Sequence, residues 1–442
     1  MTRHDVDATR VAPAPASSMG QARSCDERSL EKWAGRVGVR PSRLWAARTV
    51  SQWGDVMQFT TMALLVLRLT GSGLGVSGAV VAEVLPVVVL APLAGPLVDR
   101  LPRVKVMVAA DVGRALLASV LAIWHGQVAI VYAVAFGLSA GSVFFNPAAG
   151  SLLPTLVEDE QLVAANSGIW SAAVLSQVVL APVAGVLAGT VGYTAAFALN
   201  AASFAISAAL LGRLRSGEAP RPVTTTSMWH QGRQALGLLA TDRLLRALAL
   251  AQGLAALSAG ATSALLVLLI RRHVHATTTD YGLALAAIGI GAFTGPLILN
   301  RLRPTGRDAR IVFGAFGLSG TVDLILATVT ALPASLGALV GYGLGTSTGN
   351  VSFSSLIQRH VPDDTRGRIF SAFDLIWHSA RLASIIAGGA IADAYGIRTV
   401  YYAGGVLLIL AALAGIGAGR RQPTPRSHRD LTHRPPASRP ST

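Results

Sequence analysis

The sequence predicts an all-α membrane protein with twelve transmembrane helices in two pseudo-symmetric six-helix bundles. The composition, the length of the apolar runs and the distribution of positive charges all point to this fold. Hydrophobic residues make up 52% of the 442 residues and charged residues only 13%, and the mean hydropathy is +0.53. A soluble domain of this size does not need so much apolar surface. We therefore expect most of the chain to lie in a lipid bilayer.

The apolar runs are long enough to cross a membrane. A helix needs about 20 mostly apolar residues to cross a hydrocarbon core of about 30 Å. The runs are continuous rather than alternating, which favours helices over strands. The predicted spans, in chain order, are 44–69, 76–98, 104–124, 127–147, 162–190, 193–212, 244–270, 280–300, 309–330, 333–353, 366–394 and 397–418.

The positive charges predict the orientation, because Lys and Arg near span ends are retained on the cytosolic side. Residues 1–43 carry eight Lys or Arg residues, residues 213–246 carry six, and the tail after Gly419 carries six. All three segments fall on one side of the predicted spans, so we expect both termini in the cytosol. The other side holds Arg271, Arg272 and Arg398, with Arg68 at a boundary.

An internal repeat predicts two halves. FTGPLILNRLRPTGRDAR (293–310) echoes LAGPLVDRLPRVK (93–105), about 200 residues earlier. The predicted division is an N-terminal cytosolic arm, two six-helix bundles joined by a polar cytosolic linker, and a basic tail. In the same order, the ranges are 1–43, 44–212, 213–243, 244–418 and 419–442.

Several functional classes are excluded by the residue inventory. The net charge of +15 is dispersed over loops and tails, which argues against a nucleic-acid-binding surface. Cys25 is the only cysteine, so neither an intrachain disulfide nor a cysteine-based metal site is possible. Lys32 and Lys105 are the only lysines, and neither follows a glycine as a P-loop requires. The acidic pair 363–364 precedes two arginines and is interpreted as a helix cap rather than a magnesium site. We expect no enzyme activity, no cofactor and no metal.

Two carboxylates inside predicted spans are candidates for proton coupling. Ionisable groups are costly in lipid and therefore face a cavity or a partner. Glu83 lies in the outer third of the span 76–98, with no basic residue within a turn, and is the first candidate for a proton carrier. Asp55 lies near the middle of the span 44–69 and is the second. Because Asp55 follows Gly54, a packing role competes evenly with a cavity role.

Other buried charges are candidates with competing structural roles. Asp111 and Arg114 are three residues apart on one helix face, and we expect a brace between them rather than a binding site. Asp374, His378 and Arg381 occur at helical spacing in the span 366–394. Arg381 either balances Asp374 two turns away or attracts an anionic substrate, and the first alternative is favoured.

The loop GPLVDRLPRVK (95–105) resembles the loop between helices 2 and 3 of the major facilitator superfamily of secondary transporters. In that family the loop acts as a conformational lock, and the resemblance implies the same role here. It also implies two helical halves around a central cavity that opens alternately to each side. Pro102 replaces a glycine of the pattern and stiffens the turn. The residues that carry the match include Gly95, Asp99, Arg100 and Arg103.

Further segments resemble one branch of that superfamily, the macrolide efflux proteins and enterobactin-type siderophore exporters. They include 69–100, 144–167 and 366–382. APVAG (181–185) is similar to an exporter motif of helix 5, with Pro182 and Gly185 matching it. The resemblance implies a proton-driven exporter in the inner membrane of a bacterium. Its expected substrate is a hydrophobic or amphipathic small molecule, either a drug-like natural product or a siderophore, and we expect the protein to be a monomer. The alternatives are a metabolite importer of the same fold and a membrane sensor or assembly partner without transport.

Overall fold

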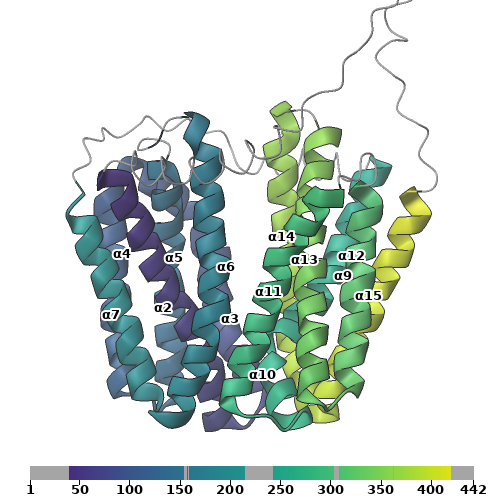
Figure 1. The fold of residues 1–442 in the computed structure, drawn as a ribbon, viewed down its shortest axis with the longest axis horizontal. Coiled ribbons are helices and arrows are strands. Elements are labelled where there is room, and N and C mark those ends of the chain that lie inside the picture. The colour runs from purple at the N-terminus through teal and green to yellow at the C-terminus, as the bar shows by residue number, and fades with distance from the viewer. Residues whose placement is uncertain are drawn as a thin grey trace, which may run out of the picture.

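The computed structural model describes residues 39–153, 157, 159–214, 242–302, 308–361 and 363–419, and every regular element in these ranges is helical. The predicted tail from residue 420 on, the arm up to residue 38 and most of the predicted linker lie outside the described residues. Figure 1 shows the helices standing side by side as two groups.

The N-terminal group contains six long helices, one at each of the first six predicted spans. Ser72 begins the second of them by accepting a hydrogen bond of 3.2 Å from the backbone N–H of Gly75, which satisfies a free donor of the first turn. The helices are α2 (Val39–Thr70), α3 (Gly73–Arg100), α4 (Arg103–Ile123), α5 (Val128–Leu152), α6 (Asp159–Thr190) and α7 (Tyr193–Gly212).

The C-terminal group covers the other six predicted spans. The predicted span 244–270 is a helix, α9, followed by a short helix and a π-helical turn, so it is less regular than expected. Asp242 caps α9 by accepting from the N–H of Leu245 at 2.9 Å. The elements are α9 (Arg243–Ala264), α10 (Leu266–Leu268), η2 (Leu269–His273), α11 (Thr278–Leu302), α12 (Asp308–Thr328), α13 (Leu332–His360), α14 (Asp363–Tyr395) and α15 (Ile397–Gly419).

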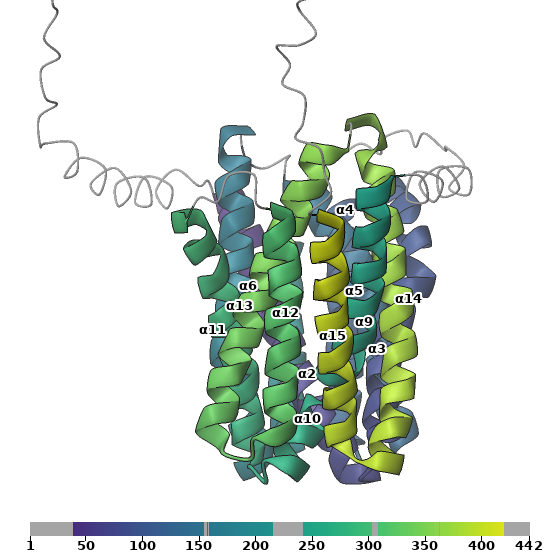
Figure 2. The same ribbon diagram turned by 90° about the vertical axis from the view of Figure 1, so that its right-hand side faces the viewer.

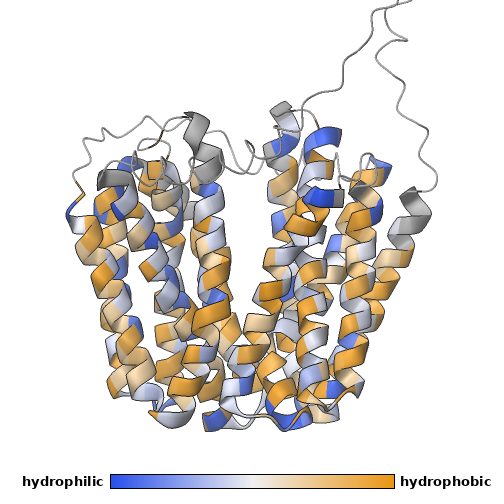
Figure 3. Cartoon of the chain, viewed as in Figure 1, coloured by the Kyte–Doolittle hydropathy of each residue, from blue (hydrophilic) through white to orange (hydrophobic). Residues whose placement is uncertain are grey.

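Nine helices of the described part are long and apolar enough to cross a membrane, and a tenth apolar segment, Ile397–Leu413, is shorter. The helices α2 and α13 do not reach this hydropathy, because α2 carries charged and polar residues along its length and α13 is rich in glycine, serine and threonine. Hydrophobic residues otherwise dominate the helices (Figure 3). The chain is thus an all-helical membrane protein.

The two groups repeat one packing pattern. In the N-terminal group α2 packs on α6 and α7, α4 on α5 and α7, and α3 on α5. The C-terminal group repeats these pairs: α9 packs on α14 and α15, α12 on α13 and α15, and α11 on α13. The helices α9 and α11 to α15 therefore correspond, in order, to α2 to α7. Between the groups, α6 packs on α11 and α3 packs on α14 (Figure 2). These two contacts are equivalent, because α3 corresponds to α11 and α6 to α14. This agrees with the repeat found in the sequence.

The groups meet at one end and diverge toward the other (Figure 1). The meeting end holds the short turns at Gly71, Gly192 and Gly396, which all have positive φ, a conformation that glycine adopts without strain. We call it the closed end. The opposite, open end holds the turn Leu101–Pro102 and the described chain ends, Val39 and Gly419.

Small residues allow the close approach at the closed end. A methyl group at Gly185 of α6 would lie 2.6 Å from the carbonyl oxygen of Thr278 at the start of α11. On the other seam, a methyl group at Gly73 of α3 would lie 2.9 Å from the carbonyl oxygen of Gly389 of α14. Both seams therefore depend on the absence of side chains, as in other close helix pairs in membranes.

Candidate functional site: a charged cavity between the two groups

A cavity lies between the groups, beyond the seams of the closed end. Its N-side chamber has a volume of about 340 Å³ and combines side chains of α2, α3 and α5 with two of α14. Carboxylate, amide, hydroxyl and imidazole groups share this chamber with apolar ones. Its polar lining consists of Asp55, Gln58, Glu83, Ser139, Ser142, His378 and Arg381.

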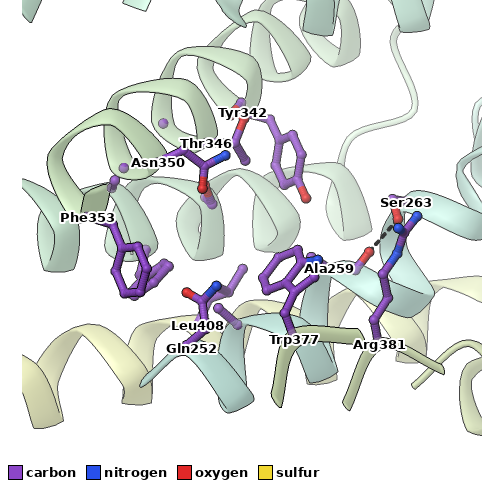
Figure 4. A pocket seen from close by; sticks show the side chains of 16 residues that line it. Gln252, Ala259, Ser263, Tyr342, Thr346, Asn350, Phe353, Trp377, Arg381 and Leu408 are labelled. Atoms are coloured by element: carbon purple, nitrogen blue, oxygen red, sulfur yellow. Dashed lines mark hydrogen bonds between the residues drawn. The ribbon is translucent and has the colours of Figure 1, made fainter. Parts of the chain in front are cut away.

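A second chamber lies within the C-terminal group and shares Arg381 with the first. This C-side chamber has a volume of about 280 Å³. Figure 4 shows Trp377 and Arg381 on one helix facing Tyr342 and Asn350 on another. Four aromatic rings and two amides line this chamber together with mostly small residues, and no carboxylate is part of its lining. Such a surface suits an apolar or aromatic ligand held by few polar contacts.

Glu83 and Arg381 lie at similar depth on opposite sides of the cavity. Glu83 is ten residues beyond Gly73 on α3, or about 15 Å at 1.5 Å per residue. Arg381 is eight residues before Gly389 on α14, or about 12 Å by the same rise. Within α3, Glu83 lies ten residues from Gly73 and seventeen from Arg100, so it is nearer the closed end than the open end. Its expected place in the outer third of the membrane stays a prediction, because it depends on the orientation of the chain. Both Glu83 and Arg381 line the N-side chamber.

Asp55 belongs to a buried charge network that the sequence indicated only in part. Arg114 forms an ion pair with Asp111 at 3.2 Å, which confirms the expected pair, and a second ion pair with Asp55. Arg114 and Asp111 are 2% and 0% exposed, whereas 40% of the Asp55 side chain is exposed. Ser51 Oγ donates to Asp111 at 3.3 Å, and the Arg114 guanidinium lies 3.9 Å from the ring centroid of Phe204. One cation thus faces two carboxylates, of which only Asp55 lines the cavity.

Gly54, the residue before Asp55, lies against α7. A methyl group at Gly54 would lie 2.5 Å from the side-chain oxygens of Asn200 and Ser203 on α7. The glycine therefore allows α2 to pack closely on α7. The sequence left a packing role and a cavity role open for Asp55. In the structure the packing role belongs to Gly54, and Asp55 lines the cavity.

Asp374 does not balance Arg381. Asp374 is exposed and lines none of the chambers, and no salt bridge within 4.0 Å joins the two residues in the described part of the chain. Seven residues along a helix correspond to about 10 Å, so the shared face does not bring the charges together. The favoured interpretation of Arg381 is wrong, and its side chain faces the cavity instead.

Asp323, on α12, is a buried carboxylate like Asp111. It is 1% exposed and accepts a hydrogen bond of 3.2 Å from Ser258 Oγ. It lines a chamber of about 190 Å³ that also contacts Tyr342 and Phe59, so this chamber adjoins both others. Asp323 belongs to the C-terminal group, and Phe59 and Gln177 of the N-terminal group line the same chamber.

The loop motif (95–105) and the helix motif (181–185) lie at opposite ends of the protein. Arg100 ends α3 and Arg103 begins α4, so the predicted basic turn is only two residues long. Arg103 donates a hydrogen bond of 3.1 Å to the carbonyl of Ser151 in α5, within its own group. The side chain of Asp99 and the surroundings of Gly95 lie outside the described features. The other motif, with Pro182 inside α6 and Gly185 against α11, forms a seam of the closed end.

Several cavity residues were missed in the sequence. Gln252, Tyr342 and Asn350 line the C-side chamber, and each interrupts a predicted apolar span with a polar group. A polar residue inside an apolar span is a sequence signal that could have identified these cavity residues. Among the described residues, no group of three or more His, Cys, Asp or Glu side chains could hold a metal ion.

Comparison with known proteins supports a transporter. Residues 40–433 match the family model described as transmembrane secretion effector, of the major facilitator superfamily. The MFS-type transporter YfiS of Bacillus subtilis is 28% identical, with 84% of this chain and 91% of YfiS covered. Macrolide efflux protein A of Streptococcus pyogenes is 25% identical, with 84% and 93% covered.

A solved structure supports the fold. The crystal structure of a bacterial homologue of the iron transporter ferroportin aligns with a TM-score of 0.70 at 20% identity and covers 86% of this chain and 98% of that one. The family match covers the described helices from residue 40 on. The chain therefore belongs to the transmembrane secretion effector family of major facilitator transporters and is a transporter rather than an enzyme.

Proposed function

We propose that the protein is a proton-coupled exporter of a hydrophobic or amphipathic small molecule in the bacterial plasma membrane. One observation carries the proposal: two carboxylates and Arg381 line a chamber between two repeated groups of helices that meet at one end only. Arg381 also lines the adjoining C-side chamber, which has several aromatic rings. A pure scaffold has no need of such costly buried charges. The similarity to macrolide efflux protein A supports export rather than import.

Alternating access would come from rocking of two six-helix bundles, 44–212 and 244–418, with twelve membrane-spanning helices in all. The repeated packing pattern supports this, because each group packs mainly within itself. If both termini are cytosolic, the structure is open to the cytosol and ready to accept a substrate there. The loop with Asp99, Arg100 and Arg103 would then act as a lock when the open end closes.

The C-side chamber would hold the apolar part of the substrate and the N-side chamber would carry the proton. Trp377, Phe316 and Phe353 offer aromatic surface, and aromatic groups contribute most of the energy in such pockets. Glu83 is the first candidate for the proton carrier and Asp55 is the second, because the side chains of both line the cavity.

The test is efflux from energised cells that express the protein. A deletion strain is first screened against a panel of amphipathic antibiotics and siderophores, and the compound with the largest change in susceptibility is then used in radiolabelled efflux. We expect the protein to export the compound against its concentration gradient, and we expect this efflux to stop when a protonophore is added. Unchanged efflux with the protonophore would exclude proton coupling, and accumulation dependent on the protein would favour the importer.

A further inference from the structure

The closed end contains a pocket that the transport mechanism does not use. Its volume is about 520 Å³, and three of its lining residues are arginines: Arg68 at the end of α2, and Arg271 and Arg272 in η2. We call it the three-arginine pocket. No carboxylate is part of its lining.

Contacts within the protein fix the three guanidinium groups. Arg271 Nη1 donates to the carbonyl of Ala276 at 2.6 Å, and Arg272 Nη2 donates to the carbonyl of Gly71. Arg68 lies over the ring of Tyr193, 5.6 Å from its centroid. A guanidinium group has five N–H donors, so these contacts orient each group and leave further donors for a ligand.

Neighbouring carboxylates do not neutralise the pocket. Asp280 accepts hydrogen bonds of 2.7 Å from the backbone N–H and the hydroxyl of Thr277, and so caps its own helix. Asp393 interacts electrostatically with Arg272, but its oxygens accept from the first residues of α3. The charge of Arg68 and Arg271 therefore remains without a carboxylate partner among the described salt bridges.

The sequence context makes these arginines unusual. Among the described residues, Lys and Arg are concentrated near the open end, and η2 places two adjacent arginines at the opposite end. Positive charge on that side runs against the usual distribution in membrane proteins. Neither arginine forms the salt bridge that could account for it; both bind backbone carbonyls instead.

The pocket also bridges the two groups of helices. Arg68, Gly189 and Tyr193 come from the N-terminal group, whereas Arg271 and Arg272 come from the C-terminal group. A ligand that contacts arginines from both sides would hold the closed end together. When the groups move apart at this end, the three arginines separate and the site is lost.

We propose that the three-arginine pocket binds a phosphate-class anion and that this anion stabilises the state in which the closed end is shut. Guanidinium groups pair with phosphate oxygens in bidentate geometry. The pocket lies where α2, α6 and η2 end. An anionic phospholipid headgroup is one source of the phosphate group, and free phosphate is the other. The chemistry of the site is the same for both.

The experiment uses the full chain in nanodiscs of phosphatidylcholine, with or without phosphatidylglycerol, and separately with inorganic phosphate in the buffer. The thermal unfolding midpoint and the lipid retained in native mass spectrometry are measured. The variants are Arg68→Gln/Arg272→Gln, the charge-retaining Arg68→Lys/Arg272→Lys, and the control Arg398→Gln. Arg398 lies at the same end, outside the pocket, where it donates to the carbonyl of Ala327 at 2.9 Å.

Expected is stabilisation of the wild type by phosphatidylglycerol or by phosphate, with about fivefold weaker binding for each arginine removed. The lysine variant retains most of the effect, and Arg398→Gln retains all of it. Stabilisation by phosphatidylglycerol alone would identify a lipid headgroup as the ligand, and stabilisation by phosphate alone would identify a soluble anion. The same stability with and without both anions in the wild type, or equal losses in Arg398→Gln and the pocket variants, would overturn the proposal.

Discussion

The carboxylate of Asp393 on α14 accepts a hydrogen bond of 2.6 Å from the backbone N–H of Gly73, the first residue of α3 in the other group of helices. It also accepts from Ser72 Oγ at 2.6 Å and from the N–H of Leu74 at 3.0 Å. Free N–H groups at a helix start favour a negative partner. The Asp393 carboxylate thus caps α3 of the opposite group and joins the two groups at the closed end.

We predict that Asp393→Asn loosens the closed end. An amide has one acceptor oxygen and no charge, so the variant loses part of three hydrogen bonds, and charged hydrogen bonds of this kind correspond to about a tenfold change in an equilibrium. The measurement is a spin-label distance between Val191→Cys and Ala331→Cys, two exposed turns of the closed end in opposite groups, in a Cys25→Ser background. The population with the longer distance should increase.

Asp280→Asn is the matched control for this test. Asp280 lies at the same end but accepts hydrogen bonds from Thr277, at the start of its own helix. It should leave the distance distribution unchanged. A distribution in Asp393→Asn that equals that of the wild type would show that the cap does not hold the groups together.

The helix positions could be predicted from the sequence, but the contacts between distant helices could not. Each of the twelve apolar runs coincides with helical residues, because span length depends on bilayer thickness alone. The pair Asp111–Arg114 follows from a spacing of three. In contrast, the partner of Asp55 is 59 residues away, and only tertiary packing decides that Arg381 faces the cavity rather than Asp374.

A second prediction concerns the stability of the Asp55–Arg114–Asp111 network. Arg114→Met removes the cation from between two carboxylates, and the loss of one partner of a buried pair costs about 3–5 kcal/mol. The thermal unfolding midpoint in detergent and the abundance in membranes should both fall strongly. Asp55→Asn should cost much less, because Arg114 keeps the buried Asp111 as its partner.

The double variant Arg114→Met/Asp111→Leu tests the cause. When both buried charges are replaced by apolar groups, much of the lost stability should return. If the double variant is as unstable as Arg114→Met alone, packing of the arginine on the ring of Phe204, rather than charge, would explain its importance.

A third prediction concerns orientation. Cys25 is the only cysteine, and the charge distribution predicts a cytosolic N-terminus. A membrane-impermeant maleimide should label Cys25 in inverted vesicles and not in intact cells. Labelling in intact cells would reverse the orientation and would make the open end the outer one.

A fourth prediction concerns coupling, and it separates Glu83 from Asp55. Both carboxylates line the N-side chamber, but Asp55 is paired with Arg114, whereas no ion pair within 4.0 Å involves Glu83 in the described part of the chain. A proton carrier must gain and lose its proton as the cavity changes sides, and a permanent cationic partner opposes protonation. We therefore expect Glu83→Gln to abolish efflux against the gradient and Asp55→Asn to reduce it less. The measurement is efflux from energised cells, with and without a protonophore.

Downhill exchange of labelled for unlabelled substrate in proteoliposomes distinguishes coupling from folding. Exchange needs binding and rocking but no net proton movement, so Glu83→Gln should retain it while losing uphill efflux. Asp374→Asn, a change at an exposed carboxylate outside the chambers, should leave both activities intact. If Glu83→Gln retains full uphill efflux, Glu83 is not the carrier and Asp55 takes its place, because it is the other carboxylate of the chamber. If both exchange and efflux are lost together with membrane abundance, Glu83 stabilises the fold and the assignment to coupling fails.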